Sequence, residues 1–320
     1  MAGGYLTPEI LQQQLAAVEA LTTAPYGINL FFSGKRSYLS KGQSHAWEDY
    51  RAMLMQNPDF AELLDKDPKS DDDFYWEKLK LALQSKARVI SITFGYPNLG
   101  IIKQIHQMGK WVVLNATTPE EIKYLSKTPV DAIVVQGKEA GGHRATVLSS
   151  EEEGARYTTE ALLQHALALT DKPIIAAGGI GTAATALSLI RQGARAVQVG
   201  TAFLLAKEAG TKLGHKKAMI AMKSRKTQLT RAFSGRLART IENQFANKYS
   251  KVAPSLYPEV HYLTLPVRVV ANKKGNAEHL NLWAGEHFAE TQEGSAAEIV
   301  EKLTPYSSSF SFIEGNRNEP

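Results

Sequence analysis

The sequence predicts an α/β fold of the TIM (β/α)8 type, incomplete at its N-terminus, with a smaller and mainly helical domain attached. Short apolar runs alternate with helical patterns between residues 26 and 207, as in a parallel sheet covered by helices on both faces. Two strand–glycine–helix units follow one another between residues 172 and 207. Beyond residue 207 the pattern indicates long helices as far as about residue 250.

The composition excludes several kinds of site. The chain has 320 residues, 43% of them hydrophobic, and no cysteine. This rules out disulfides, thiolate metal sites and cysteine nucleophiles, and it is compatible with the cytoplasmic localisation that we expect. No apolar run approaches the roughly 18 residues that a membrane span needs, and the N-terminus does not have the pattern of a secretory signal. We therefore expect no membrane partner, and the scattered histidines predict no metal site.

Positive charge is concentrated in one segment. The formal net charge is +5, and residues 211–251 hold eleven Lys or Arg against one acid, Glu242. Such a segment attracts anions or nucleic acid, or it forms a solvated helix face. We favour the solvated face, because no nucleic-acid-binding motif accompanies the charge, and we expect no nucleic-acid partner.

The order of elements follows from caps, periodicity and turn residues. Thr7 and Pro8 begin a helix as N-cap and first helical residue. A polar and irregular excursion, a candidate lid, occupies residues 33–80, and a last helix covers 295–303. Six strands are expected near 26–32, 89–95, 111–116, 132–137, 173–179 and 196–201. Two missing barrel strands would expose sheet edges. The expected domains are a barrel (1–207 and about 280–305), a helical substrate or lid domain (about 208–280) and a polar tail (306–320).

The segment 131–143 contains the main candidate for chemistry. A buried strand, 132–135, is followed by Gln136, two adjacent glycines and His143. Catalytic loops of α/β proteins lie at the same place, at the carboxyl ends of the strands. The alternative for His143 is a structural histidine bonded to a neighbouring loop. In the strand near 26–32, Asn29 interrupts an apolar run, and its side chain needs a partner if it is buried.

Two glycine-rich strand ends predict a phosphate site. The strand 173–179 ends in Gly178–Gly179 and the strand 196–201 ends in Gly200–Thr201, each before a helical start. Glycines let a phosphate approach the main chain, and a helix N-terminus offers unpaired N–H groups. The tandem arrangement is typical of the phosphate site after the last two strands of a TIM barrel. Ordinary turns without a ligand are the alternative.

Several motifs together resemble one family along nearly the whole chain. They are Gly27-Ile-Asn-Leu-Phe31, Thr93-Phe-Gly-Tyr-Pro97, Val134-Val-Gln-Gly-Lys-Glu-Ala-Gly-Gly-His-Arg144, Ala176-Ala-Gly-Gly-Ile180, Val197-Gln-Val-Gly-Thr-Ala-Phe203, Ala232-Phe-Ser-Gly-Arg-Leu-Ala-Arg239 and Leu282-Trp-Ala-Gly285. The chain resembles the nitronate monooxygenases. The resemblance implies an FMN-binding TIM barrel that oxidises alkyl nitronates with O2 to a carbonyl compound and nitrite.

The resemblance also implies roles for individual residues. His143 matches the catalytic histidine of the family, and Tyr96 is expected in the substrate pocket. The implied flavin contacts are Asn29 and Gln136 to the ring, Gly141 where the backbone closes on the cofactor, and Gly179 with Gln198, Val199, Gly200 and Thr201 around the phosphate.

Two alternatives stay open at this point. Members of the family usually have an extra strand, helix and strand before the segment that matches residues 2–5. This difference leaves room for a shortened, non-catalytic protein that binds phosphate or flavin ligands, or nothing. The other alternative is the related FMN- and NADH-dependent enoyl-acyl carrier protein reductase. Arg144 after the Gly-Gly-His motif favours the monooxygenase.

Overall fold

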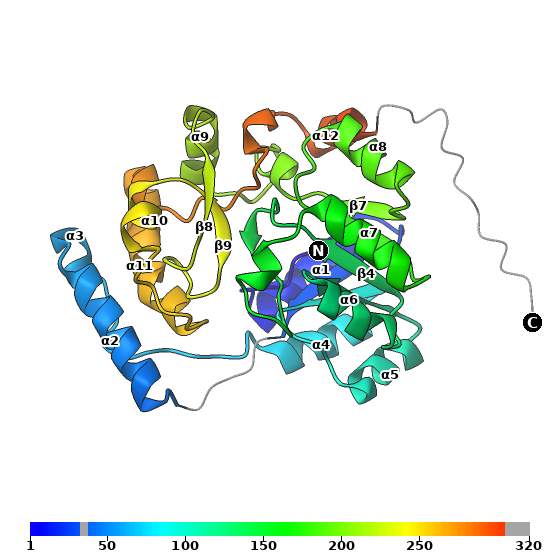
Figure 1. Cartoon of the computed structure of the whole chain (residues 1–320), viewed down its shortest axis with the longest axis horizontal. Coiled ribbons are helices and arrows are strands. Elements are labelled where there is room, and N and C mark those ends of the chain that lie inside the picture. Colours follow the sequence, from blue (N-terminus) through cyan, green and yellow to red (C-terminus); the bar gives the residue numbers. More distant parts are fainter. Residues whose placement is uncertain (33–37, 305–320) are drawn as a thin grey trace, which may run out of the picture.

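The computed structural model describes residues 1–32 and 38–304, and its centre is an open sheet of six parallel strands (Figure 1). The strand order β1-β2-β3-β4-β6-β7 follows the sequence, so each strand lies beside its successor as in half of a barrel. This confirms the predicted α/β class and the six strands. Their bounds are β1 Gly27–Phe31, β2 Val89–Thr93, β3 Trp111–Ala116, β4 Ala132–Gln136, β6 Ile174–Ala177 and β7 Ala196–Gln198.

Helices cover the outer face of this sheet, and four of them begin at threonine caps, of which the sequence analysis predicted Thr7. Thr7, Thr118, Thr158 and Thr182 each accept a hydrogen bond from a backbone N–H of the first helical turn. These helices are α1 Pro8–Leu21, α4 Tyr75–Gln84, α5 Leu99–Gln107, α6 Pro119–Ser126, α7 Thr159–Leu169 and α8 Ala183–Arg191.

The two faces of the parallel sheet contribute to different apolar clusters. Ile28, Leu30 and Ile90 belong to the large core between strands and helices. The opposite face holds a smaller apolar cluster that includes Val113 and Val134. Because successive residues of a strand point to opposite faces, this division follows directly from the sequence.

The first residues of the chain lie along the edge of β1. Ala2 forms a parallel bridge with Asn29, and the N–H of Gly3 donates to the Asn29 carbonyl at 2.8 Å. Lys78, fully buried in α4, donates to the Gly3 carbonyl at 2.8 Å and pairs with Asp73 at 2.6 Å. Part of the predicted open sheet edge is therefore paired.

The prediction of long helices from residue 208 to about 250 is wrong. This segment contains helix α9 (Leu213–Ala221) and strands β8 (Thr227–Thr230) and β9 (Ala238–Ile241), which form an antiparallel sheet of order β5-β9-β8. Strand β5 is Gly142–His143, so pairing with a distant segment decides the structure here. Gly235, with φ of +77°, lies in the turn between β8 and β9.

Residues 33–37 of the predicted excursion lie outside the described residues, and residues 38–80 are divided between two cores. Helix α2 (Lys41–Met55) packs Trp47 and Tyr50 into a cluster with Phe233 and Phe245, and the Tyr50 hydroxyl donates to the Ala232 carbonyl at 2.7 Å. In Figure 1, α2 and α3 lie beside α10 and α11, away from the parallel sheet. The remaining bounds are α3 Pro58–Ala61, α10 Gln244–Tyr249, α11 Glu259–Lys274 and α12 Ala296–Leu303, with 3-10 helices η1 Glu153–Ala155, η2 Thr201–Phe203, η3 Ala277–His279 and η4 Phe288–Glu290.

Two sequence predictions concern the limits of the described structure. The polar tail expected at residues 306–320 lies outside the described residues. Within residues 1–32 and 38–304, none of the helices combines the length and apolar character that crossing a bilayer requires.

Candidate active site

The loop between β4 and β5 is fixed by its own polar side chains. The Gln136 amide donates to the His143 carbonyl at 3.1 Å, and its oxygen accepts the N–H of Ala145 at 2.9 Å. The fully buried Arg144 donates to the carbonyls of Gly137 at 2.7 Å and Gln136 at 2.6 Å. Burial lowers the pKa of Arg144 to about 10, so the side chain stays charged at neutral pH. These bonds hold the backbone on both sides of His143.

A buried carboxylate secures the segment that follows. Glu121 in α6 accepts from the N–H groups of Val147 at 2.5 Å and Leu148 at 2.9 Å through one oxygen. Its other oxygen accepts from the N–H and the hydroxyl of Thr117, at 2.7 and 2.9 Å. The side chain is completely buried, and the N–H groups of Thr117, Val147 and Leu148 depend on it, whereas the Thr117 hydroxyl also lies 2.8 Å from that of Thr146.

We expect Glu121→Gln to destabilise the protein by about 1–3 kcal/mol, because the new amide N–H2 faces donors that need an acceptor. Urea unfolding measures the difference. Glu120→Gln is the matched control, since Glu120 is exposed on the same helix and its loss changes stability little. Equal stabilities of the two variants would contradict this account of the loop.

His143 lies on β5 in a shell of aromatic rings. Its ring centroid is 5.2 Å from that of Trp283, 5.7 Å from that of Phe94 and 5.9 Å from that of Tyr257. Its Nε2 lies 2.8 Å from the hydroxyl of Ser234. His143 is therefore held in position by partners from four separate segments.

The electrostatics of this shell favour a neutral imidazole. Burial, followed by the positive charges of Arg236 and Arg268, lowers the pKa of His143 to about 3. The imidazole is therefore uncharged at pH 7, and an imidazolium waiting for an anion is disfavoured.

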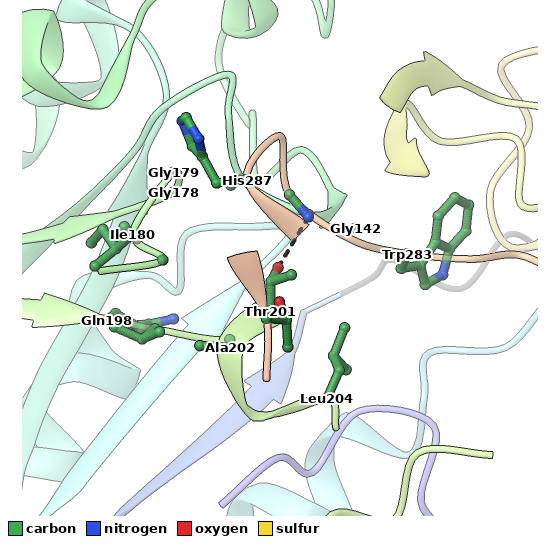
Figure 2. A pocket seen from close by; sticks show the side chains of 18 of the residues that line it. Gly142, Gly178, Gly179, Ile180, Gln198, Thr201, Ala202, Leu204, Trp283 and His287 are labelled. Atoms are coloured by element: carbon green, nitrogen blue, oxygen red, sulfur yellow. Dashed lines mark hydrogen bonds between the residues drawn. The ribbon is translucent and has the colours of Figure 1, made fainter. Parts of the chain in front are cut away.

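A cavity of about 300 Å³ lies at the carboxyl ends of the last strands (Figure 2). In this view Gly178, Gly179, Ile180 and His287 lie toward one end and Trp283 toward the other. The lining residues are Gln136, Ala140, Gly141, Gly142, Ala177, Gly178, Gly179, Ile180, Gly181, Gln198, Val199, Gly200, Thr201, Ala202, Leu204, Trp283, Gly285, His287 and Thr291.

One end of the cavity is a cradle of free backbone donors. In the described part of the chain, the N–H groups of Gly179, Gly181 and Gly200 have no hydrogen-bond acceptor. Gly179 has φ of +69°, a conformation that favours glycine, and a Cβ at Gly200 would meet nothing within 4 Å. Helix α8 begins just beyond Gly181 and directs its N-terminus to this region. The cradle is suited to an anion such as a phosphate.

The opposite wall comes from a segment near the C-terminus. The N–H of Gly285 donates to the Thr201 hydroxyl at 3.0 Å, the dashed line of Figure 2. A Cβ at Gly141 would lie 2.5 Å from the nitrogen of Gly285, so a side chain at Gly141 would separate the two loops. Glycine at position 141 therefore closes the backbone around the cavity.

The structure brings most of the predicted cofactor contacts together. Seven of them line the one cavity: Gln136, Gly141, Gly179, Gln198, Val199, Gly200 and Thr201. His143 follows the lining residue Gly142 directly in the chain. The predicted residues therefore meet although they come from separate strands.

Besides His143, which lies next to the lining residue Gly142, Asn29 and Tyr96 are predicted site residues that do not line the cavity. Asn29 is half-buried, and its amide donates to the hydroxyls of Ser91 and Thr93, both at 2.9 Å, so it has the partners that the sequence led us to expect. The Tyr96 hydroxyl donates to the Asn115 carbonyl at 2.8 Å, and its ring stacks on Tyr124. Their proposed roles beside flavin and substrate stay predictions.

Several residues of the site had no role assigned to them from the sequence. Trp283 and Gly285 stand in a motif that supported the family resemblance, and Ser234 stands in another, so these motifs were the available signal. His287 lines the cavity, and its Nδ1 lies 3.4 Å from Glu290, but nothing in its local sequence marks it.

Comparison with known proteins agrees with this geometry. The sequence model of the nitronate monooxygenase family matches residues 1–306. A probable nitronate monooxygenase of Bacillus subtilis is 32% identical over 306 residues, which cover 95% of this chain and 86% of that protein. A probable nitronate monooxygenase of Staphylococcus aureus is 31% identical over 291 residues, covering 89% of this chain and 80% of the relative.

Solved structures show the same relationship. The nitroalkane oxidase from Streptomyces ansochromogenes is similar with a TM-score of 0.87 and 36% identity, over 95% of this chain and 86% of that one. FabK from Thermotoga maritima, at 20% identity and a TM-score of 0.68 over 94% of this chain and 82% of its own, is alike in fold alone. The resemblance seen in the sequence is confirmed, and the chain belongs to the nitronate monooxygenase family of flavin-dependent oxidoreductases.

Proposed function

We propose that this protein is an FMN-dependent nitronate monooxygenase that converts alkyl nitronates and O2 into carbonyl compounds and nitrite. One observation carries the proposal: a single cavity extends from free backbone donors at Gly179 and Gly200 to Gln136 and Gly142, directly beside His143. This is the arrangement that a phosphate-bearing planar cofactor and a small substrate need.

The residues of the cavity fit FMN in kind. The glycine cradle would hold the phosphate through backbone N–H groups, and the apolar side chains of Ile180 and Leu204 with the ring of Trp283 provide walls for a flat heterocycle. The Gln136 amide lies at the same cavity and can bond a polar ring edge. When bound, FMN supplies the electron transfer from the nitronate and onward to O2.

The protein's own side chains then bind the substrate and move one proton. Arg236 and Arg268 provide positive potential at His143, which attracts an anionic nitronate. Neutral His143 can take the carbon-bound proton of a neutral nitroalkane, which gives the nitronate. The aromatic rings of Phe94, Tyr257 and Trp283 shield this place from water.

Two measurements test the proposal. The first is an absorbance spectrum of the purified protein after incubation with FMN, and the second is a nitrite assay with propionate 3-nitronate. We expect a bound flavin spectrum and nitrite that depends on O2. Bleaching of the flavin by NADH without any nitronate would favour the reductase instead. A colourless protein would indicate that it does not catalyse flavin chemistry.

A further inference from the structure

Ser234 is held rigidly beside His143 although 91 residues separate them in the sequence. It lies in the turn between β8 and β9, is 1% exposed, and donates its N–H to the Arg231 carbonyl at 3.1 Å. At the next residue, Gly235, a Cβ would lie 2.2 Å from the Leu256 carbonyl oxygen, so the turn packs tightly on a neighbouring loop. The Ser234 hydroxyl therefore has a fixed place.

Three polar groups surround this hydroxyl. Its oxygen lies 2.8 Å from Nε2 of His143. It lies 3.1 Å from the carbonyl oxygen of Arg236 and 3.4 Å from the N–H of the same residue. A hydroxyl has one hydrogen to donate and two lone pairs that accept, so three partners use it completely.

Counting hydrogens decides the direction of each bond. The Arg236 carbonyl can only accept, so it takes the hydroxyl hydrogen of Ser234, and the Arg236 N–H can only donate. One lone pair remains, and His143 must supply the hydrogen to it from Nε2. If Ser234 donated to Nε2 instead, its oxygen and the Arg236 carbonyl oxygen would face each other at 3.1 Å with no hydrogen between them. The Arg236 carbonyl would then lose the donor that it has in the described chain.

We propose that Ser234 is a positioning residue that keeps His143 in its Nε2–H tautomer and leaves Nδ1 as the basic nitrogen. Nδ1 makes no hydrogen bond with any residue that the structure describes, so it is free to react. The tautomer assignment is independent of the proposed function, and only the role of Nδ1 as the base of the reaction rests on it.

The reaction step balances with this assignment. The carbon-bound proton of a neutral nitroalkane moves to Nδ1, and the electron pair of the C–H bond becomes a C=N bond of the nitronate. The negative charge resides on the nitro oxygens, and the imidazolium keeps its Nε2–H directed at Ser234. Without Ser234 the other tautomer becomes accessible, and it has a hydrogen where the substrate proton must go.

Nitrogen NMR of the full chain with 15N-labelled histidine reads the tautomer directly. The His143 signals are assigned by their loss in His143→Gln. At pH 7 we expect a protonated Nε2 and an unprotonated Nδ1 in the wild type, and a mixed or reversed tautomer in Ser234→Ala. A protonated Nδ1 in the wild type, or an unchanged tautomer in the variant, would overturn the proposal.

Kinetics provide a second reading. For Ser234→Ala we expect kcat with a neutral nitroalkane to fall about 10- to 100-fold, with a small change in KM and little loss with a preformed nitronate. Ser126→Ala is the control, because the Ser126 hydroxyl bonds only its own helix, to the Lys123 carbonyl. An equal loss of activity with nitroalkane and nitronate would count against a role in proton transfer.

The NMR result needs no turnover, so it remains valid if the proposed function is wrong. If Ser234→Ala does not fold, the wild-type spectrum alone decides whether the tautomer assignment is correct.

Discussion

Replacing His143 with alanine lowers nitrite release from neutral nitroalkanes by about 10²- to 10⁴-fold, the usual contribution of a positioned general base. The reason is geometric: the imidazole lies on β5 beside the cavity, and burial with two nearby arginines keeps it neutral at pH 7. FMN should stay bound, because the imidazole is not among the groups that line the phosphate cradle. Steady-state nitrite assays and the flavin absorbance of the same sample measure both effects.

The choice of substrate separates proton transfer from binding. A preformed nitronate has already lost its proton, so His143→Ala should retain far more activity with it than with the parent nitroalkane. His165→Ala is the matched control, because His165 is exposed on α7 and does not line the cavity. Unchanged turnover of the nitroalkane by His143→Ala would remove this residue from the mechanism.

The parts of the site that could be predicted are those encoded by local sequence. An apolar run that stops at glycine marks a strand end, and parallel strands bring their carboxyl ends to one edge, so Gly179 and Gly200 had to meet. The roles of Gln136 and Gly141 beside the cofactor were implied by the family resemblance. The structure bears out that meeting in one cavity.

The parts that escaped prediction depend on contacts between distant segments. Strands β8 and β9 have four residues each, and β9 pairs with β5. The residue pattern within 227–241 does not indicate this pairing. Ser234 reaches His143 only through this sheet. Phe94, with φ of +76°, holds an unfavourable backbone conformation where its ring contacts both His143 and the guanidinium of Arg236.

Gly179→Val should weaken FMN binding by about 30- to 1000-fold, equivalent to about 2–4 kcal/mol for disturbed hydrogen bonds to a charged phosphate. A Cβ at this position would lie 3.1 Å from Glu139, and the branched side chain would project beside N–H groups that are free in the described chain. The cradle would then be narrowed from inside. Titration of flavin fluorescence with the protein measures the dissociation constant.

Backbone strain alone could also reduce retention, because φ of +69° at Gly179 costs a branched residue about 1–2 kcal/mol. Gly109→Val separates the two causes. Gly109 has nearly the same φ, +67°, but it lies exposed after α5, and a Cβ there would meet nothing within 4 Å. If both variants lose the same stability but only Gly179→Val binds FMN more weakly, the weaker binding is caused by the change in the cradle. Equal weakening in both would show that strain transmitted through the fold, and not blocked phosphate donors, controls the affinity.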